Sequence, residues 1–507
     1  MKSSCAVPSA GRNLMAAFLA TVTFVLSVSC ATPSAAKPSA PFPLAGEGSS
    51  FGSSYGKSGL PAFAKANLGS FATFTLSNGL PVILKKNSAN KIQHVSLVVR
   101  GGSAAVSEAR AGYEAVALKT MARGSAQHSY EDIQALLDET SSAIGSASSF
   151  DSSTYYLTTL DKYFSKLLPV WADTVTEPSF RPEDFDKVLS EAKMTLQSKE
   201  QDPWAKTGLK MNEIFFSGHP YAASPDGTLE SLDAMKIGDA KAWYASRVAA
   251  SELFVVAVGD FDSGALRAQL EATLGKLPAS AAALPPAPPP LARPGPGSLA
   301  KIEFPASRGM GYLRGDFAAP PPSSPDFMPL NLGMQLLSDL LFNIVRDKHG
   351  AVYTPSSYIR AFQANYGSIC LFKTKIPGPA KAFIDEAVAV LASGRAVAPD
   401  PEKSADGFAP IAEALDAAKA EYVNALYESQ ATNSAIAASI AQSVITRGDY
   451  RDYLLDADRI EAVTPEQVSA ALDTWLLKGS IAWAALGSAD VLIGAQEVDF
   501  EGFASAR

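Results

Sequence analysis

The chain has 507 residues, of which 47% are hydrophobic and 19% are charged, so it can bury a large core and is neither disordered nor fibrous. Its 43 Lys and Arg against 51 Asp and Glu give a formal net charge of -8. An acidic chain without a basic run is not expected to have nucleic acid as its main partner. Ordinary domain sizes predict about two to four globular units for this length.

The beginning of the chain has the pattern of a bacterial secretory signal. Lys2 and Arg12 precede an apolar stretch over residues 14–28, which is too short for a comfortable membrane span. The stretch ends in Leu-Ser-Val-Ser followed by Cys30, which is similar to a relaxed lipobox, where the cysteine receives lipid. We therefore expect a lipoprotein signal peptide over residues 1–29 and lipidation at Cys30. An ordinary signal peptide with an incidental cysteine is the alternative.

This interpretation predicts a lipid-anchored protein of the bacterial cell envelope, periplasmic or exposed on the surface. Cys5 would leave with the signal peptide and Cys30 would be capped, so Cys370 alone would remain as a thiol. No intramolecular disulfide is then expected. Residues 30–68 are rich in Ser, Pro, Gly and Ala, which favours a flexible tether between the anchor and the folded body.

Secondary-structure signals follow in chain order. Alternation over residues 71–76, a turn at Asn78-Gly79 and an apolar run over residues 81–84 predict a hairpin. A strand is expected over residues 95–100, and apolar residues at helical spacing predict a packed helix over residues 111–122. The remaining elements expected in this half are a helix over residues 130–139 and strands over residues 153–159 and 253–258.

The chain divides at a proline-rich segment. Residues 279–299 contain seven prolines, which suit neither a helix nor a sheet interior, and we expect a linker there. The segments on either side end alike, because a helix with Trp243 and a helix with Trp475 each lead to an apolar strand. This indicates an internal duplication, with domains at 69–278 and 300–492. Residues 393–410 are expected to form a surface insertion in the second domain.

A collinear set of motifs over roughly residues 70–490 resembles the insulinase (pitrilysin) family of zinc metallopeptidases. In the first half the matching residues are Asn78-Gly79-Leu80, Gly101-Gly102-Ser103, Gly112, Gly124, Thr154, Tyr156, His219-Pro220-Tyr221 and Gly227-Thr228, and in the second half they are Arg346, Gly350 and Tyr353. The resemblance implies an α+β fold of two homologous domains, each a mostly antiparallel sheet backed by helices. The two halves of such a fold would enclose a chamber.

The zinc motif of the family is degenerate in this chain. Active members carry His-x-x-Glu-His on the first helix, where two histidines on one face bind zinc and the glutamate activates the bound water. Alignment on the flanking glycines places Ala115, Leu118 and Lys119 at these three positions. The family's third ligand, a glutamate, falls near Thr195, with Glu191 about one turn away. Glu191 is interpreted as a solvated helix residue, with a displaced ligand as the alternative.

No other metal or nucleophile site stands out. The four histidines include no pair three to five residues apart, so a helical ligand pair is absent, and Cys370 sits in an apolar run typical of a core thiol. We therefore expect no metal and no cofactor in this chain, and no hydrolysis of peptides by the chain alone. An active peptidase with an unrecognised metal site is the least favoured interpretation.

The second-half signature is intact. The resemblance implies that Arg346 and Tyr353 hold substrate and stabilise the developing oxyanion, for which a guanidinium and a phenol are suitable donors. The structural alternative is an arginine that complements the end of its helix and a tyrosine packed in the sheet. The resemblance further implies capture of an extended peptide along an edge strand formed by Ser146, Ala147, Ser148, Ser149 and Phe150.

Two functions remain open. One is the Arg346 and Tyr353 subunit of a two-chain peptidase, with zinc on an insulinase-family partner chain, since the family includes such divided enzymes. The other is a non-catalytic lipoprotein that binds peptides or scaffolds an envelope assembly. A neighbouring gene for a zinc-competent relative would favour the first function.

Overall fold

The computed structural model describes residues 52, 59–222, 224–249, 253–279, 285–295, 299–400, 402 and 404–493. The expected signal peptide and Cys30 lie outside these residues. Within the described ranges, no helix combines the length and the apolar character that a membrane span requires.

The first half is built on a six-stranded sheet with the strand order β1-β2-β6-β3-β5-β4. Its strands are β1 (Phe71–Thr75), β2 (Pro81–Lys86), β3 (Ile92–Arg100), β4 (Ala143–Ser148), β5 (Ser152–Leu160) and β6 (Leu253–Gly259). The strands β1 and β2 form the expected hairpin, and all neighbours are antiparallel except β2 and β6.

The second half is built on a five-stranded sheet with the order β7-β13-β8-β10-β9. Its strands are β7 (Leu299–Glu303), β8 (Gly311–Ala319), β9 (Thr354–Ile359), β10 (Asn365–Thr374) and β13 (Ala482–Gly487). A small hairpin of β11 (Arg395–Val397) and β12 (Phe408–Pro410) lies in the expected insertion. In both sheets the last strand of the half pairs in parallel with a strand from its beginning, β6 with β2 and β13 with β7. This shared topology supports the duplication and confirms the α+β class.

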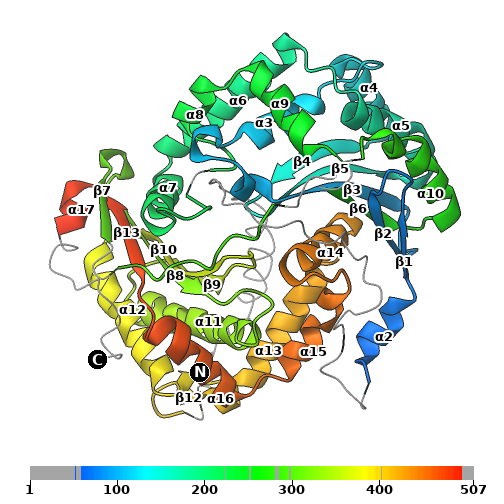
Figure 1. Ribbon diagram of the computed structural model, residues 1–507. Helices are drawn as coiled ribbons and strands as arrows, with labels where there is room; N and C mark the ends of the chain where they lie inside the picture. Colours follow the sequence, from blue (N-terminus) through cyan, green and yellow to red (C-terminus); the bar gives the residue numbers. More distant parts are fainter. Residues whose placement is uncertain are drawn as a thin grey trace, which may run out of the picture.

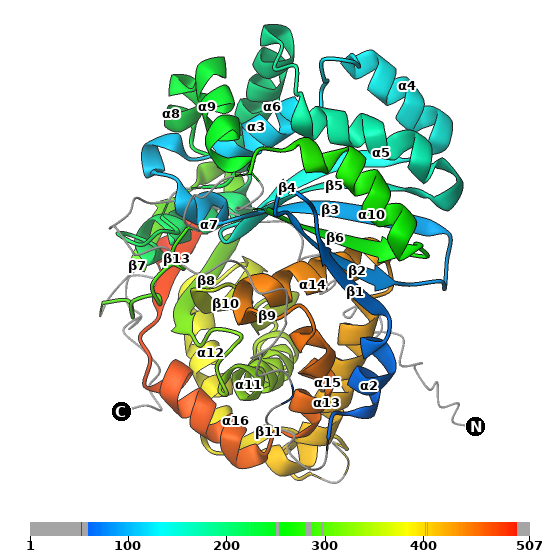
Figure 2. The ribbon, with the colours of Figure 1, turned by 45° about the vertical axis from the view of Figure 1, so that its right-hand side comes forward.

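Helices cover both sheets (Figures 1 and 2). Those of the first half are α2 (Ala62–Leu68), α3 (Tyr113–Met121), α4 (Tyr130–Thr140), α5 (Asp161–Thr176), α6 (Pro182–Gln201), α7 (Pro203–Phe215), α8 (Leu229–Ala234), α9 (Ile237–Arg247) and α10 (Ser263–Ala272). Those of the second half are α11 (Phe327–Leu341), α12 (Pro377–Ala392), α13 (Ile411–Glu428), α14 (Asn433–Arg447), α15 (Asp456–Glu461), α16 (Pro465–Leu472) and α17 (Ala489–Ile493). Single π-helical segments follow α11 and α16, at Phe342–Lys348 and Asp473–Leu477.

One helix of each half packs on the sheet of the other half. Along β6, Leu253, Val255 and Ala257 face the helices of the first half, whereas the alternate residues belong to a second core shared with α14. In return, α7 packs on β8 and β13, where Met211 and Phe215 share a core with residues of the second sheet. Figure 1 shows α14 below β3 and β6 and α7 beside β8 and β13. Both sheets are therefore covered on both faces only when the halves are together.

Two expected boundaries differ in the structure. The tether predicted over residues 30–68 ends earlier, because residues 62–68 form α2, whose Ala64 is fully buried in the core shared with α14. Residues 62–68 contain alanines and other residues that favour a helix, but the composition of residues 30–68 as a whole is that of a linker. The linker predicted over residues 279–299 ends one residue sooner, since β7 begins at Leu299.

A buried hydrogen-bond network joins the halves. The carboxylate of Asp151 accepts a hydrogen bond from the phenol of Tyr221 and one of 2.8 Å from the backbone N–H of Gln363 in the second half. Ala364 N–H in turn donates to the Tyr221 oxygen at 3.2 Å. Burial raises the pKa of Asp151 to about 6, even though both donors favour the charged form.

This pKa predicts a pH-dependent stability. Because Asp151 binds its proton more tightly in the folded protein than in the unfolded chain, the free energy of unfolding should fall as the pH rises from about 4 to about 6, by up to about 3 kcal/mol. The variant Asp151→Asn should lack this contribution. Urea unfolding of both proteins between pH 4 and pH 7.5 measures this free energy. If the free energies of unfolding of the wild type and the variant differed by the same amount at every pH, the assignment to Asp151 would be contradicted.

Candidate active site

The helix that carries the degenerate motif begins at a glycine. Gly112 has a φ of 80°, and a Cβ there would lie 2.7 Å from the Cα of Gly227, so only glycine permits this contact. From this start, α3 runs between α6 and α9 and packs against both. The helix thus keeps a fixed place beside the element that would carry the third ligand.

The side chains at the zinc-motif positions of α3 serve packing or face solvent. Leu118 is 1% exposed and belongs to the core of the first half, whereas Ala115 is half-buried and Lys119 is exposed. The side chains of alanine and leucine have no metal-binding atom, and the ammonium of Lys119 repels a divalent cation.

The position of the third ligand is equally unsuited to zinc. Thr195 is exposed on α6, and its hydroxyl donates to the carbonyl of Glu191 at 2.9 Å. Glu191 is exposed as well, as expected for a solvated helix residue. Across the part of the chain that the structure describes, no group of three or more His, Cys, Asp or Glu side chains is placed to hold a metal ion.

One acidic residue of α3 escaped the sequence analysis. Glu114, next to Ala115, is 2% exposed and lies between α3 and α9. Burial raises the pKa of its carboxyl, opposed by the charge of Arg247 and by Ser153 and Trp243. Both of its carboxylate oxygens are enclosed in the packing of α3, so Glu114 is not placed as a metal ligand. Its position just before a residue of the motif was the available signal.

The structure brings Arg346 and Tyr353 together. Arg346 lies in the π-helical segment after α11, and its guanidinium is 5.0 Å from the ring centroid of Tyr353 and 4.2 Å from that of Phe342. Gly350, with a φ of 60°, allows the helix to end between them. Tyr353 is 77% exposed, so it is not the packed sheet residue of the structural alternative. Arg346 is half-buried, and its Nε also forms an ion pair of 3.6 Å with Asp347. The pair therefore presents an exposed phenol beside a partly buried guanidinium.

An edge strand is present where peptide binding was expected, but it is shorter than predicted. The strand β4 is the outermost strand of the first sheet, and it contains Ser146, Ala147 and Ser148, all half-buried. Ser149 and Phe150 lie beyond its end. Phe150 is 2% exposed, and the centroid of its ring lies 3.9 Å from that of Tyr221. Its large ring packs in the apolar interface between the halves. The available edge therefore ends at Ser148.

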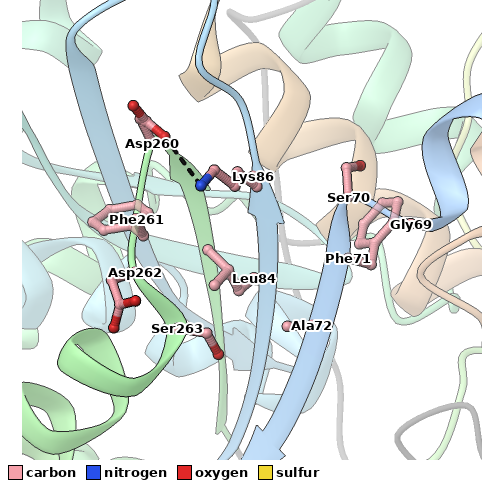
Figure 3. A pocket seen from close by; sticks show the side chains of 10 residues that line it. All are labelled: Gly69, Ser70, Phe71, Ala72, Leu84, Lys86, Asp260, Phe261, Asp262 and Ser263. Atoms are coloured by element: carbon pink, nitrogen blue, oxygen red, sulfur yellow. Dashed lines mark ion pairs between the residues drawn. The ribbon is translucent and has the colours of Figure 1, made fainter.

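A surface pocket at the opposite edge of this sheet is unrelated to these residues. It has a volume of about 450 Å³ and lies against β1 and the end of β6 (Figure 3). Lys86 and Asp260 form an ion pair of 3.4 Å across it, and Asp260 also pairs with Lys91 at 3.7 Å. Its charges thus compensate one another, and none of the predicted site residues lines it.

Two family models match the chain. The model described as "Insulinase (Peptidase family M16)" matches residues 81–224, and the model described as "Peptidase M16 inactive domain" matches residues 235–393. The chain belongs to the insulinase family. Within that family, this homologue lacks the histidines and the glutamate of the zinc motif, as the residues at 115, 118 and 119 show.

Similar proteins include peptidases and one named non-peptidase. "Non-peptidase homolog YmxG" of Helicobacter pylori is 23% identical over 199 residues, which are 39% of this insulinase homologue and only 46% of that relative. The structure of a peptidase M16 inactive domain from Pseudomonas fluorescens has a TM-score of 0.70 and 21% identity, over 82% of this chain and 98% of that chain. The periplasmic protease PqqL from Escherichia coli has a TM-score of 0.67 and 18% identity, over 96% of this chain and 49% of that chain. At these identities the two structures establish the fold alone.

The side chains at the motif positions predict that the purified homologue holds no stoichiometric zinc after dialysis, as measured by elemental analysis. The triple variant Ala115→His, Lys119→His and Thr195→Glu should gain a zinc site, because it restores three ligands on the packed helices α3 and α6 without disturbing buried Leu118. Zinc titration with a competing chelator measures the gain. One tight zinc in the unaltered protein, lost in Glu191→Gln, would reveal a displaced site instead.

Proposed function

We propose that this insulinase homologue is inactive alone and is the subunit that supplies Arg346 and Tyr353 to a two-chain zinc peptidase acting on extended peptides. The observation that carries the proposal is the exposed Tyr353 beside the half-buried Arg346, while the zinc positions hold Ala115 and Lys119. A solvent-exposed tyrosine on an arginine has no evident role in packing. Facing a partner, it would complete a site.

The chemistry of the pair suits an amide under attack. Zinc on the partner chain would supply the Lewis acid and the activated water. The phenol of Tyr353 and the guanidinium of Arg346 are hydrogen-bond donors, and such donors strengthen as the carbonyl oxygen of the substrate gains negative charge. Peptide would bind as an added strand along β4, where the backbone of residues 146–148 is at the edge of the sheet.

The second candidate, a peptide-binding or scaffolding lipoprotein, needs only that edge. Backbone pairing along β4 does not depend on zinc, so capture of an extended peptide would survive the loss of hydrolysis. This candidate gives Arg346 and the exposed Tyr353 no function, which is why we favour the divided peptidase.

The divided peptidase predicts activity only from the two chains together. With a zinc-bearing partner, Tyr353→Phe and Arg346→Ala should each lower peptide turnover about a hundredfold or more, without preventing assembly, because each removes a donor to the developing charge. Hydrolysis of a fluorogenic peptide by each chain and by the mixture measures this. Tyr427→Phe, at another exposed tyrosine, is the matched control. Full activity from the Tyr353 and Arg346 variants would favour the scaffold.

A lipid anchor at Cys30 is part of the proposal, and it places the protein in the bacterial cell envelope. Firm attachment needs more than one acyl chain, as a bacterial lipoprotein carries. The variant Cys30→Ser should therefore move the protein from the membrane fraction to the soluble fraction when expressed in a bacterium. Identical partitioning of the wild type and the variant, measured after high-salt washing of membranes, would remove the anchor from the proposal.

A further inference from the structure

The two exchanged helices cover sheet faces of unlike chemistry. The face under α14 is apolar and consists of residues such as Val98, Phe254 and Val256. The corresponding face under α7 carries a polar cluster on β8, β9 and β10 and just after β9. Its buried members are Arg314, Asp316, Ser368 and Cys370, and its half-buried members are Tyr358 and Arg360. Burying charge is costly unless it is compensated, so this departure from the apolar pattern calls for a cause.

One of the two arginines is compensated within the fold. Arg314 donates from Nε and Nη2 to the carboxylate of Asp316, at 2.7 to 3.1 Å, and Asp316 is fully buried. Ser368 adds a hydrogen bond of 2.7 Å to the same carboxylate. The carboxylate is therefore fully engaged and neutralises the charge of Arg314 alone.

Among the residues that the structure describes, no carboxylate pairs with the second arginine. Arg360 donates from Nη2 to the phenol oxygen of Tyr358 at 3.2 Å, and its guanidinium carbon lies 4.6 Å from the centroid of that ring. Its Nε is inaccessible to solvent and has no hydrogen-bond partner, although the residue as a whole is half-buried. Burial raises the pKa of the Tyr358 phenol, and burial raises the pKa of the Cys370 thiol to about 11, so neither group supplies a negative charge near neutral pH. One positive charge remains in the cluster.

This charge borders a cavity between the halves. The cavity has a volume of about 90 Å³ and is lined on one side by Arg314, Arg360 and Tyr366 and on the other by α7, including Gly208 and Asn212. Lys199 and Asp226, also in its wall, form an ion pair with each other. The net charge at the wall is thus positive. Its volume is enough for a small planar anion.

We propose that this cavity binds a carboxylate group through the charge of Arg360, with Nη1 of Arg314, which lies on the side of Gly208, as a second donor. A carboxylate is planar, carries the one negative charge that the cluster lacks, and accepts paired hydrogen bonds from a guanidinium. Gly208 lies on the opposite wall, where an added Cβ would be 3.4 Å from Nη1 of Arg314, so the absence of a side chain there keeps the space in front of the arginines open. This site is independent of the divided peptidase, because it lies wholly within one chain.

The carboxylate has two possible sources, a free small acid or the C-terminus of a peptide. Thermal unfolding of the purified chain is followed in increasing sodium acetate, with sodium chloride holding the ionic strength constant. Parallel titrations use tetra-alanine with a free C-terminus and the same peptide as its amide. A ligand that binds only the folded chain raises Tm along a curve set by its Kd. We expect a saturable rise with acetate or with the free-acid peptide, and none with the amide.

Three variants test the assignment. Arg360→Met should weaken the binding about tenfold or more, because it removes the charged donor and nearly keeps the volume. Gly208→Leu should block the cavity while keeping both arginines. Arg395→Met, the same substitution in the surface hairpin, should leave the titration unchanged.

The proposal is overturned if no carboxylate gives a saturable rise, if the amide acts as well as the acid, or if Gly208→Leu binds like the wild type. Unaltered binding by a folded Arg360→Met would also overturn it. Should Arg360→Met fail to fold, the wild-type titrations and Gly208→Leu still decide the question.

Discussion

The exchange of α7 and α14 between the halves is the constraint on which the rest of the molecule depends. Strands such as β6 are buried on both faces, and the second face is apolar because a helix from the other half covers it. Each fully buried Val or Phe there is worth about 1.5–3 kcal/mol relative to exposure. The two halves therefore share two cores in addition to the linker that joins them.

The packing of α3 explains how a chain of this fold can lack the metal site and keep its shape. The position of α3 is set by the Gly112–Gly227 contact and by packing on α6 and α9, and Leu118 adds to the core where the family has a glutamate. The zinc ligands of the family are side chains on a helix that packs without them, so α3 stays folded when they are absent. Arg346 and Tyr353 sit on a different helix end, and nothing in the loss of the first site disturbs them.

Much of the fold was accessible from the sequence, because its signals are local. Alternation and the Asn78-Gly79 turn predicted the first hairpin, and helical spacing predicted α3. The motif spacing also identified Arg346 and Tyr353, which the structure places side by side. What the sequence did not yield depends on contacts across the two halves. From the sequence, Phe150 is expected at the end of an edge strand, but its ring packs in the interface between the halves. Likewise α2 is expected to belong to the tether, but it packs in a core shared with α14.

The buried arginines were missed for the same reason. Arg314 and Asp316 alternate with apolar residues along β8, a pattern that is typical of a strand with one solvated face. Only the placement of α7 over that face turns a solvated pair into a buried one and encloses Arg360 beside it. Long-range helix exchange leaves no periodicity that a single sequence could reveal.

The exchange also has a consequence in time. The first sheet is complete once β6 has been synthesised, but Phe254 and its neighbours stay uncovered until the residues from Ile436 onward are available. The two parts of this core are thus far apart in the chain, so the face of β6 closes only after a long-range contact has formed, and such contacts form slowly. Until then the first half presents an apolar sheet face, which makes a partly folded chain of this architecture prone to association with other chains.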